Sequence, residues 1–477
     1  MTPQRLACVP ARPDRPTEPD GPPSQVAAAG VGPPSRRESL RAGGPSRGRP
    51  GRTPRVTLRR FAVRRPPGEQ HVTSARLLAV LALVLMAVAD TKVRVRGSAS
   101  SVSGHVDGYV VAEVGLFVGI AAVVIGMYPG RRFFAHRFGP TSAIAILFVA
   151  DLLLSALYSP FPALAAVRAC ETFVWCALAV QLWEFGGLET LHRLAHSFVI
   201  MICAATFIGF VSREPSAALE TTRFSWLSVH PVVAASWLGI SATILVAYLL
   251  AATGGNTIAL WHPNVYLMLL VGQVAALIAT GTRGAVAAFA CAALTVAVGH
   301  VSARRRLEFL VVVAILSAIA WLTASGPISS FAARGESAAR LASLNGRTEL
   351  WALAWTTIKQ APWFGHGLTA SRGLFLDRTT LGGGHNAAVN VLVDQGFLGL
   401  GLYALLCLAL LLSLTRLPVG LRAHAWAPLG VVVFLMAHGL TVEYMVAPAT
   451  TSFAWFLLVV VWAGLIRRHP AAARRKA

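Results

Sequence analysis

The chain has 477 residues, of which 55% are hydrophobic and 13% are charged, and its formal net charge is +22. Soluble globular proteins carry about 25% charged residues, so this composition excludes an ordinary soluble domain and indicates an integral membrane protein. The excess of Arg does not require a nucleic-acid partner, because Arg in cytoplasmic loops orients membrane proteins. We therefore expect no nucleic-acid binding. The six Cys residues include no CxxC pair, which speaks against a zinc site or a disulfide framework.

Residues 1–74 are rich in Pro, Gly, Arg and Ser and poor in aromatic residues. Such a segment cannot bury enough apolar surface to offset the entropy of ordering, so we predict a disordered cytoplasmic tail. The tail could contact anionic lipid headgroups, or it could act only in setting topology, and we favour the second interpretation. Residues 467–477 form a second, shorter basic tail, which we also expect in the cytoplasm.

Between the tails, over residues 75–466, apolar runs of spanning length alternate with short polar breaks. They predict an all-α polytopic membrane protein with about twelve transmembrane helices. With both termini in the cytoplasm, clusters such as Arg304–Arg305–Arg306 fall on the inner side, as the positive-inside rule requires, whereas Lys92, Arg94 and Arg96 fall outside against that rule. The twelve spans are expected at 75–90, 108–127, 141–158, 162–185, 192–211, 230–252, 263–280, 284–300, 307–325, 386–414, 425–442 and 447–466.

One long polar stretch, residues 326–385, interrupts this pattern and falls on the outer face as a large loop. Its charged residues give a net charge of +3, and an excess of Arg on that side suggests an anionic ligand. Within the loop, Thr348–Gln360 has helical spacing, and Pro362 and the following Gly-His-Gly turn end the helix. The apolar face predicts an amphipathic helix at the membrane interface. That face comprises Leu350, Trp351, Ala354, Trp355 and Ile358.

Two Arg residues are candidates for binding the anion. Arg283 lies in the TGTRGA turn between two apolar spans, where a guanidinium is costly unless something pairs with it. The flanking Gly281 and Gly284 would let a ligand approach the backbone. Arg347, in NGRTELW, precedes the loop helix, whose N-terminal N–H groups also favour an anion. Arg283 could instead reach to lipid headgroups, and Arg347 could be an exposed loop residue.

His385, in GGGHN, opens the tenth span and is the candidate base, because a neutral imidazole can accept a proton near pH 7. It could instead be a polar residue at a span entrance. Asn386 could cap the helix that follows. Secondary candidates in the same loop are Arg334, Arg340, Arg372 and His366.

The order of these motifs resembles the O-antigen ligase / O-antigen polymerase family of polytopic membrane glycosyltransferases. The resemblance covers roughly residues 280–403. That family has an Arg in an SRGA-like turn, an Arg before a Trp-containing helix and a P-x-x-G-x-G turn, and an HN pair before an acidic residue and spaced glycines. Here Thr282 precedes Arg283 where the family has Ser, and Gln395 separates Asp394 from Gly396.

The resemblance implies a GT-C-like fold and an inverting, metal-independent glycan transfer on the outer face of the cytoplasmic membrane, without a cofactor. The donor would be a glycan on a polyprenyl diphosphate such as undecaprenyl diphosphate, and the acceptor a saccharide, a lipid or a protein. Arg283 and Arg347 would bind the donor diphosphate. His385 would take the proton of the acceptor hydroxyl. The large outer loop would form a lid and part of the active site and exclude water.

Three alternatives remain open at this point. A polysaccharide polymerase of the same family would use the same motifs. A twelve-helix transporter would fit the spans, although such transporters show internal repeats that this sequence lacks. A membrane scaffold whose tail binds partners is the third.

Overall fold

In the structure, a computed structural model, each of the twelve predicted spans lies on a helix. The described residues are 67–90, 108–127, 139–212, 223–227, 229–333, 347–378, 383–448 and 450–468, so the predicted tail up to residue 66 and the loop residues Arg334 and Arg340 lie outside them. The α-helices are α1 (Pro67–Ala89), α3 (Gly108–Gly126), α4 (Pro140–Ser155), α5 (Pro162–Phe185), α6 (Leu188–Ser212), α7 (Pro231–Thr253), α8 (Pro263–Ala279), α9 (Arg283–His300), α10 (Arg306–Ala333), α12 (Arg347–Ile358), α13 (Ala370–Arg378), α14 (Ala387–Thr415), α15 (Arg422–Gly439) and α16 (Thr451–Arg468).

Within the described residues, nine helices are long and apolar enough to cross a membrane, and no strand occurs. The three remaining predicted spans, on α1, α3 and α8, have shorter apolar stretches. The chain is therefore an all-α polytopic membrane protein, as predicted. The number of twelve spans stays a prediction.

Several helices begin with the residues that favour a helix start. Pro occupies the first turn of α4, α5, α7 and α8, where its missing N–H removes no intrahelical hydrogen bond. The side chains of His230 and His262 accept hydrogen bonds from Val232 N and Asn264 N and so cap α7 and α8. These two His residues therefore have structural roles in ending loops and starting spans.

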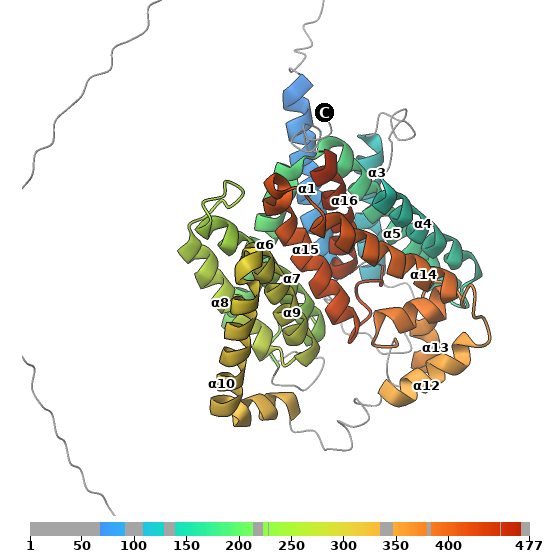
Figure 1. The fold of residues 1–477 in the computed structure, drawn as a ribbon. Coiled ribbons are helices and arrows are strands. Elements are labelled where there is room, and N and C mark those ends of the chain that lie inside the picture. Colours follow the sequence, from blue (N-terminus) through green and yellow to red (C-terminus); the bar gives the residue numbers. More distant parts are fainter. Residues whose placement is uncertain are drawn as a thin grey trace, which may run out of the picture. The chain divides into compact units, whose positions relative to one another are not determined.

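Helices α7, α15 and α16 are the most buried of the nine described helices that could cross a membrane, and α9 packs against α7 and α15 (Figure 1). Glycines allow these helices to approach closely, which is how membrane helices gain packing contacts without a hydrophobic driving force. A Cβ on Gly239 of α7 would lie 2.2 Å from the Phe434 ring of α15. A Cβ on Gly430 of α15 would lie 2.6 Å from Thr243 Cγ2 of α7.

Helix α1 belongs to this bundle. The Asp90 carboxylate, at its end, accepts hydrogen bonds from Trp237 Nε1 at 2.9 Å and from Thr451 N at 2.8 Å. Asp90 thus caps α16 and joins α1 to α7. The charges that follow α1, Lys92, Arg94 and Arg96, lie outside the described residues.

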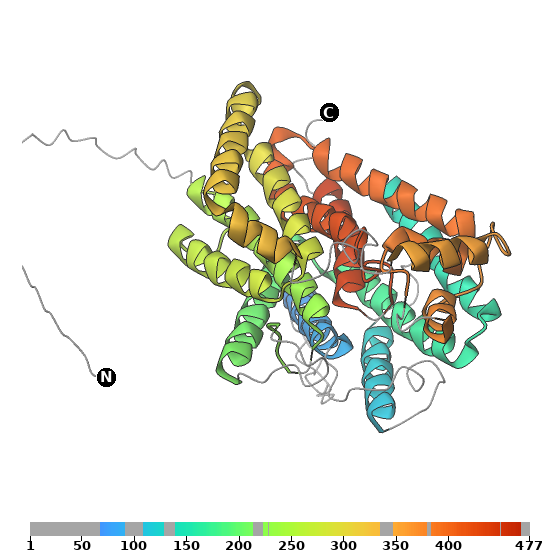
Figure 2. The ribbon, with the colours of Figure 1, turned by 90° about the horizontal axis from the view of Figure 1, so that it is seen from below.

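Helix α10 differs from the predicted span 307–325. It extends to Ala333, with a kink at Ala324 and Pro327 inside it, so the first residues of the expected outer loop are helical. None of its apolar stretch is buried, and it packs mainly against α9. Seen from below, α9 and α10 lie on one side of α15 and α16, and α12, α13 and α14 lie on the other (Figure 2). Lipid is the expected surrounding of an apolar helix that is exposed on all sides.

The segment expected as an outer loop contains two helices, α12 and α13. The predicted helix Thr348–Gln360 is present as α12, but its apolar face does not lie free along an interface. Leu350, Ala354 and Ile358 are buried together with Phe375 of α13 and Val393 of α14, whereas Trp355 is 51% exposed. The sequence does not predict α13, because the helix has only nine residues and includes Ser, Arg, Gly and Asp.

A break in α14 holds this segment in place. Gly396 has φ 65° and interrupts the helix, and the turn after α12 fills the gap. His366 N and Gly367 N donate to the carbonyls of Val393 and Asp394, and Phe397 N and Leu398 N donate to those of Pro362 and Trp363, all at 2.8–3.1 Å. The backbone groups freed by the break are thus paired, which an apolar surrounding requires.

The connections expected on the outer face meet one another. Tyr158, after α4, donates to the Phe364 carbonyl at 2.7 Å. Arg223, before α7, contacts the α8–α9 turn, and Asn386, before α14, contacts Leu440 after α15. When successive helices cross in alternating directions, every second connection lies at the same end of the bundle. These contacts between such connections therefore fit the predicted topology. The side of the membrane that this end faces stays a prediction.

Candidate functional site

The α8–α9 turn presents Arg283 as the first residue of α9. Gly281 has φ 63°, a left-handed conformation that Gly adopts without steric cost. Gly284 follows, and a Cβ there would lie 2.3 Å from Thr441 Oγ1, so Gly284 is needed for the approach of the α15–α16 connection. The two glycines are thus explained by backbone conformation and helix packing. The sequence suggested ligand approach instead.

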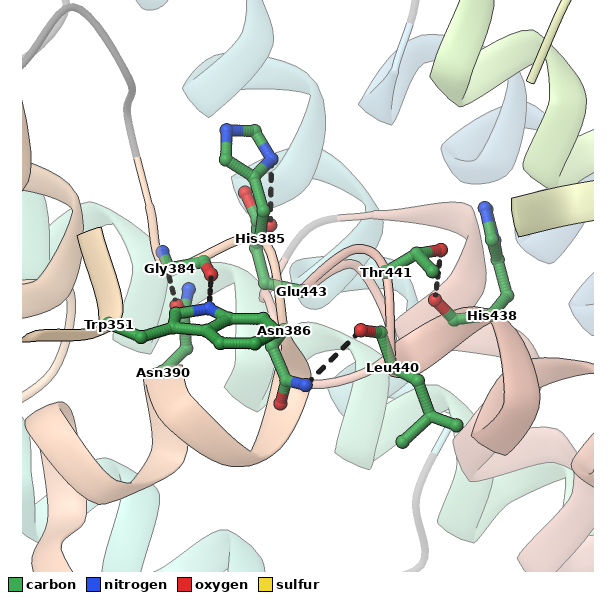
Figure 3. A network of polar contacts seen from close by, with 9 residues as sticks. All are labelled: Trp351, Gly384, His385, Asn386, Asn390, His438, Leu440, Thr441 and Glu443. Carbon is green, nitrogen blue, oxygen red and sulfur yellow. Dashed lines mark hydrogen bonds and ion pairs between the residues drawn. The ribbon is translucent and has the colours of Figure 1, made fainter. Parts of the chain in front are cut away.

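The turn before α14 presents His385. Asn386 Oδ1 accepts hydrogen bonds from the N–H groups of Ala388 and Val389 and caps α14, as its sequence position suggested. Its Nδ2 donates to the Leu440 carbonyl at 3.2 Å (Figure 3). His385 itself has φ 47°, which is uncommon for a residue with a side chain.

Two further hydrogen bonds fix the backbone just before His385. Gly384 N donates to Asn390 Oδ1 at 2.7 Å, and Trp351 Nε1 of α12 donates to the Gly384 carbonyl at 2.9 Å (Figure 3). Trp351 was expected to contribute to a membrane-facing surface. It instead joins α12 to the turn that carries His385.

Glu443, in the α15–α16 connection, faces His385. Its Oε2 lies 3.9 Å from His385 Nδ1, and the two side chains are 13% and 30% exposed (Figure 3). Among the described residues, neither Glu443 Oε2 nor His385 Nε2 has a hydrogen-bond partner. Glu443 was missed in the sequence. An acidic residue between two apolar spans, in GLTVEYMV, was the available signal, because such residues are rare unless functional.

Arg347, the first residue of α12, belongs to the same group of charges. Burial lowers its pKa, the nearby Glu443 carboxylate opposes that change, and the Arg283 guanidinium adds to it. Arg283 and Glu443 therefore both lie within electrostatic reach of Arg347. Four connections between helices therefore meet at one group of charges. Arg283 and Glu443 interact electrostatically with Arg347, and His385 lies beside Glu443.

The secondary candidates have different surroundings. His366 Nε2 lies 2.9 Å from the Thr357 carbonyl, at the end of α12, where it supports the turn. Arg372 lies on α13, whose start is capped by Asp394 Oδ1 accepting from Ser371 N at 2.6 Å. Burial raises the pKa of Tyr444, and Arg372 and Arg223 oppose that rise, so both cations lie near the α15–α16 connection.

This arrangement combines a cationic part with an acid–base pair. Two guanidiniums can bind and neutralise an anion such as a diphosphate, because their planar donors match phosphate oxygens. A His oriented by a carboxylate can accept a proton. Among the described residues, no group of three or more His, Cys, Asp or Glu side chains is placed to hold a metal ion.

Two comparisons with known proteins agree with each other. A family model described as O-antigen ligase matches residues 266–404. The O-antigen ligase of Pseudomonas aeruginosa is 26% identical to this chain over 397 residues, covering 75% of this chain and 92% of that protein. The family match includes Arg283, Arg347 and His385, whereas Arg223 and Glu443 lie outside it.

Proposed function

We propose that this chain, as a member of the O-antigen ligase family, transfers a glycan from a polyprenyl diphosphate to an acceptor hydroxyl. The reaction takes place on the outer face of the cytoplasmic membrane, with both termini in the cytoplasm. It inverts the sugar carbon and uses no metal ion or cofactor. The similarity to O-antigen ligases supports a membrane glycosyltransferase activity, and the charges of the site support an anionic donor and a His base.

The observation that carries the proposal is the pairing of His385 with Glu443 beside two Arg residues. Glu443 faces Nδ1 of the imidazole at 3.9 Å, which leaves Nε2 to accept a proton. A carboxylate in this position orients the ring and stabilises the imidazolium that forms. Glu443 is thus assigned as a positioning residue, and His385 as the base.

The reaction balances with these groups alone. The acceptor oxygen attacks the anomeric carbon of the glycan while His385 Nε2 takes the hydroxyl proton. The bond between that carbon and the phosphate oxygen breaks, and the electron pair leaves with the polyprenyl diphosphate. Arg283 and Arg347 stabilise the negative charge that develops on the leaving group.

Helices α12 and α13 form the lid of this site. They are joined to α14 by backbone hydrogen bonds and by the cluster of Leu350, Phe375 and Val393. Trp351 connects the lid directly to the backbone of Gly384. A lid that excludes water strengthens the electrostatic interactions and prevents hydrolysis of the donor.

The test is a reconstitution of the purified protein in lipid with a polyprenyl diphosphate glycan and a panel of saccharide, lipid and protein acceptors. Covalent product and released polyprenyl diphosphate are measured together. We expect both from the wild type, and neither from His385→Ala. His262→Ala is the matched control, because His262 is an exposed helix cap.

The acceptor panel separates this function from its alternatives. Addition of repeated units to a saccharide acceptor would assign the chain as a polymerase of the same family. Movement of the intact donor across the bilayer without a covalent product would assign it as a transporter. Full transfer by His385→Ala would remove His385 from the proposed role.

A further inference from the structure

Arg223 lies just before α7 and contacts the turn that carries Arg283. Its Nε donates to the Thr280 carbonyl at 2.6 Å, and one terminal nitrogen donates to Thr282 Oγ1 at 2.8 Å. The adjacent Phe224 N donates to the Ala279 carbonyl at 3.0 Å. Two consecutive residues of one connection thus hold the end of α8 and the start of α9.

We propose that Arg223 is a positioning residue for the donor diphosphate: it fixes the α8–α9 turn so that Arg283 and the first N–H groups of α9 face the ligand. The proposal rests on the proposed function, because it concerns the same donor. It assigns a role to a residue outside the stretch that matches the O-antigen ligase family model.

The hydroxyl of Thr282 shows why the contact matters. Thr282 occupies the N-cap position of α9, where a Thr side chain ordinarily accepts a hydrogen bond from the first turn of the helix. Here the Thr282 side chain makes no such bond, and its Oγ1 accepts a hydrogen bond from Arg223. The helix start beside Arg283 is therefore left without a side-chain cap, which suits an anion.

The turn also needs an external support. Gly281 has φ 63°, and the most flexible residue type is thus located two positions before Arg283. Arg223 donates to both residues that flank Gly281 and so limits the conformations of the turn. Preorganised groups bind a ligand more tightly, because less ordering remains to be done on binding.

The geometry also requires Arg in particular. Two different nitrogens of one planar guanidinium reach a backbone carbonyl and a hydroxyl at once. A Lys ammonium is a single point donor on a flexible stem and cannot reproduce this fork. Arg223 also adds a positive charge near the connection that carries Glu443, as its effect on the pKa of Tyr444 indicates.

The first experiment measures the dependence of transfer on donor concentration for Arg223→Ala, Arg223→Lys, Thr282→Val and the double variant Arg223→Ala/Thr282→Val. We expect Arg223→Ala to raise the donor KM on the order of tenfold, with a smaller change in kcat, because a displaced binding group costs up to about a hundredfold. We expect the donor KM of Arg223→Lys to lie between those of the wild type and Arg223→Ala. Arg193→Ala is the control, since Arg193 pairs with Glu189 on an exposed surface.

The double variant tests whether Arg223 acts through the turn. If it does, Thr282→Val has little further effect once Arg223 is gone, so the two effects do not add. Full additivity would mean that Arg223 acts on the donor without the turn and would overturn the proposal. A wild-type donor KM in Arg223→Ala, with unchanged thermal stability, would overturn it as well.

A second measurement does not depend on transfer. Polyprenyl diphosphate without a glycan is added to the protein in lipid, and hydrogen exchange of the amides between Thr280 and Val286 is followed. We expect protection in the wild type that is lost in Arg223→Ala; equal protection in both, or none in the wild type, contradicts the proposal. Protection without any transfer by the wild type would count against the proposed function and leave this inference standing.

Discussion

Replacing Glu443 with Gln tests the acid–base pair most directly. The substitution keeps the shape of the side chain and removes its charge 3.9 Å from His385 Nδ1. At about 4 Å, two unit charges interact by about 4 kcal/mol at the effective dielectric constant of a protein surface, and by about 1 kcal/mol in bulk water. The side chains are 13% and 30% exposed, so the interaction lies between these limits.

This interaction is made with the imidazolium, which exists only after the proton has moved, so its loss raises the barrier of the chemical step. We take about 2 to 2.7 kcal/mol as the loss, which corresponds to a decrease of kcat of about 30-fold to 100-fold. The donor KM changes little, because Glu443 does not contact the proposed diphosphate. The assay is steady-state transfer in lipid at saturating donor and acceptor.

Two further variants make the result interpretable. Glu443→Asp keeps the charge on a shorter side chain and should retain more activity than Glu443→Gln. Glu349→Gln removes an exposed carboxylate from α12 and should leave kcat unchanged. A kcat for Glu443→Gln within threefold of the wild type, at unchanged thermal stability, would refute the pairing of Glu443 with His385.

Three other substitutions have defined expected outcomes. Arg347→Ala should raise the donor KM by about tenfold or more in the same assay, and Arg347→Lys should restore only part, because a Lys donates from one point. Gly284→Ala places a methyl group 2.3 Å from Thr441 Oγ1, so transfer should fall, and a second change, Thr441→Ala, should recover part of it. Asp90→Ala leaves buried donors unpaired, including Thr451 N, and should destabilise the protein by about 2 kcal/mol, measured as a lower Tm.

Hydropathy was sufficient to locate the membrane helices. The predicted span 162–185 coincides with α5, and 386–414 differs from α14 by one residue at each end. The largest differences occur at α1 and α10, which extend into polar sequence that hydropathy assigns to a tail or a loop. Packing against α13 and α14 also determined which face of α12 is buried, and no periodicity in one helix can specify its partner.

The charged site was only partly predictable for a related reason. Arg283, Arg347 and His385 lie in short motifs that stand out against apolar surroundings. Glu443 and Arg223 gain their importance from contacts between connections that are far apart in sequence. Glu443 could have been identified as an acidic residue between spans. Arg223 carries no comparable local signal, because its partners are a backbone carbonyl and a hydroxyl.

The turn after α12 is attached to the break in α14 by backbone hydrogen bonds, and we call this contact the joint. The joint also determines which positions near it can vary over evolutionary time. Its four hydrogen bonds are made by backbone groups alone, so they do not depend on the side chains of Trp363 and Phe364. Gly365 and Gly396 are different, because a Cβ on either would come within 2.5 Å of backbone atoms across the joint. Saturation mutagenesis should therefore give a sharp pattern, with intolerance at the two glycines beside wide tolerance at the adjacent aromatic positions. The proposed lid, α12 and α13, could then diversify its outer surface toward new acceptors while its attachment to α14 stays constant.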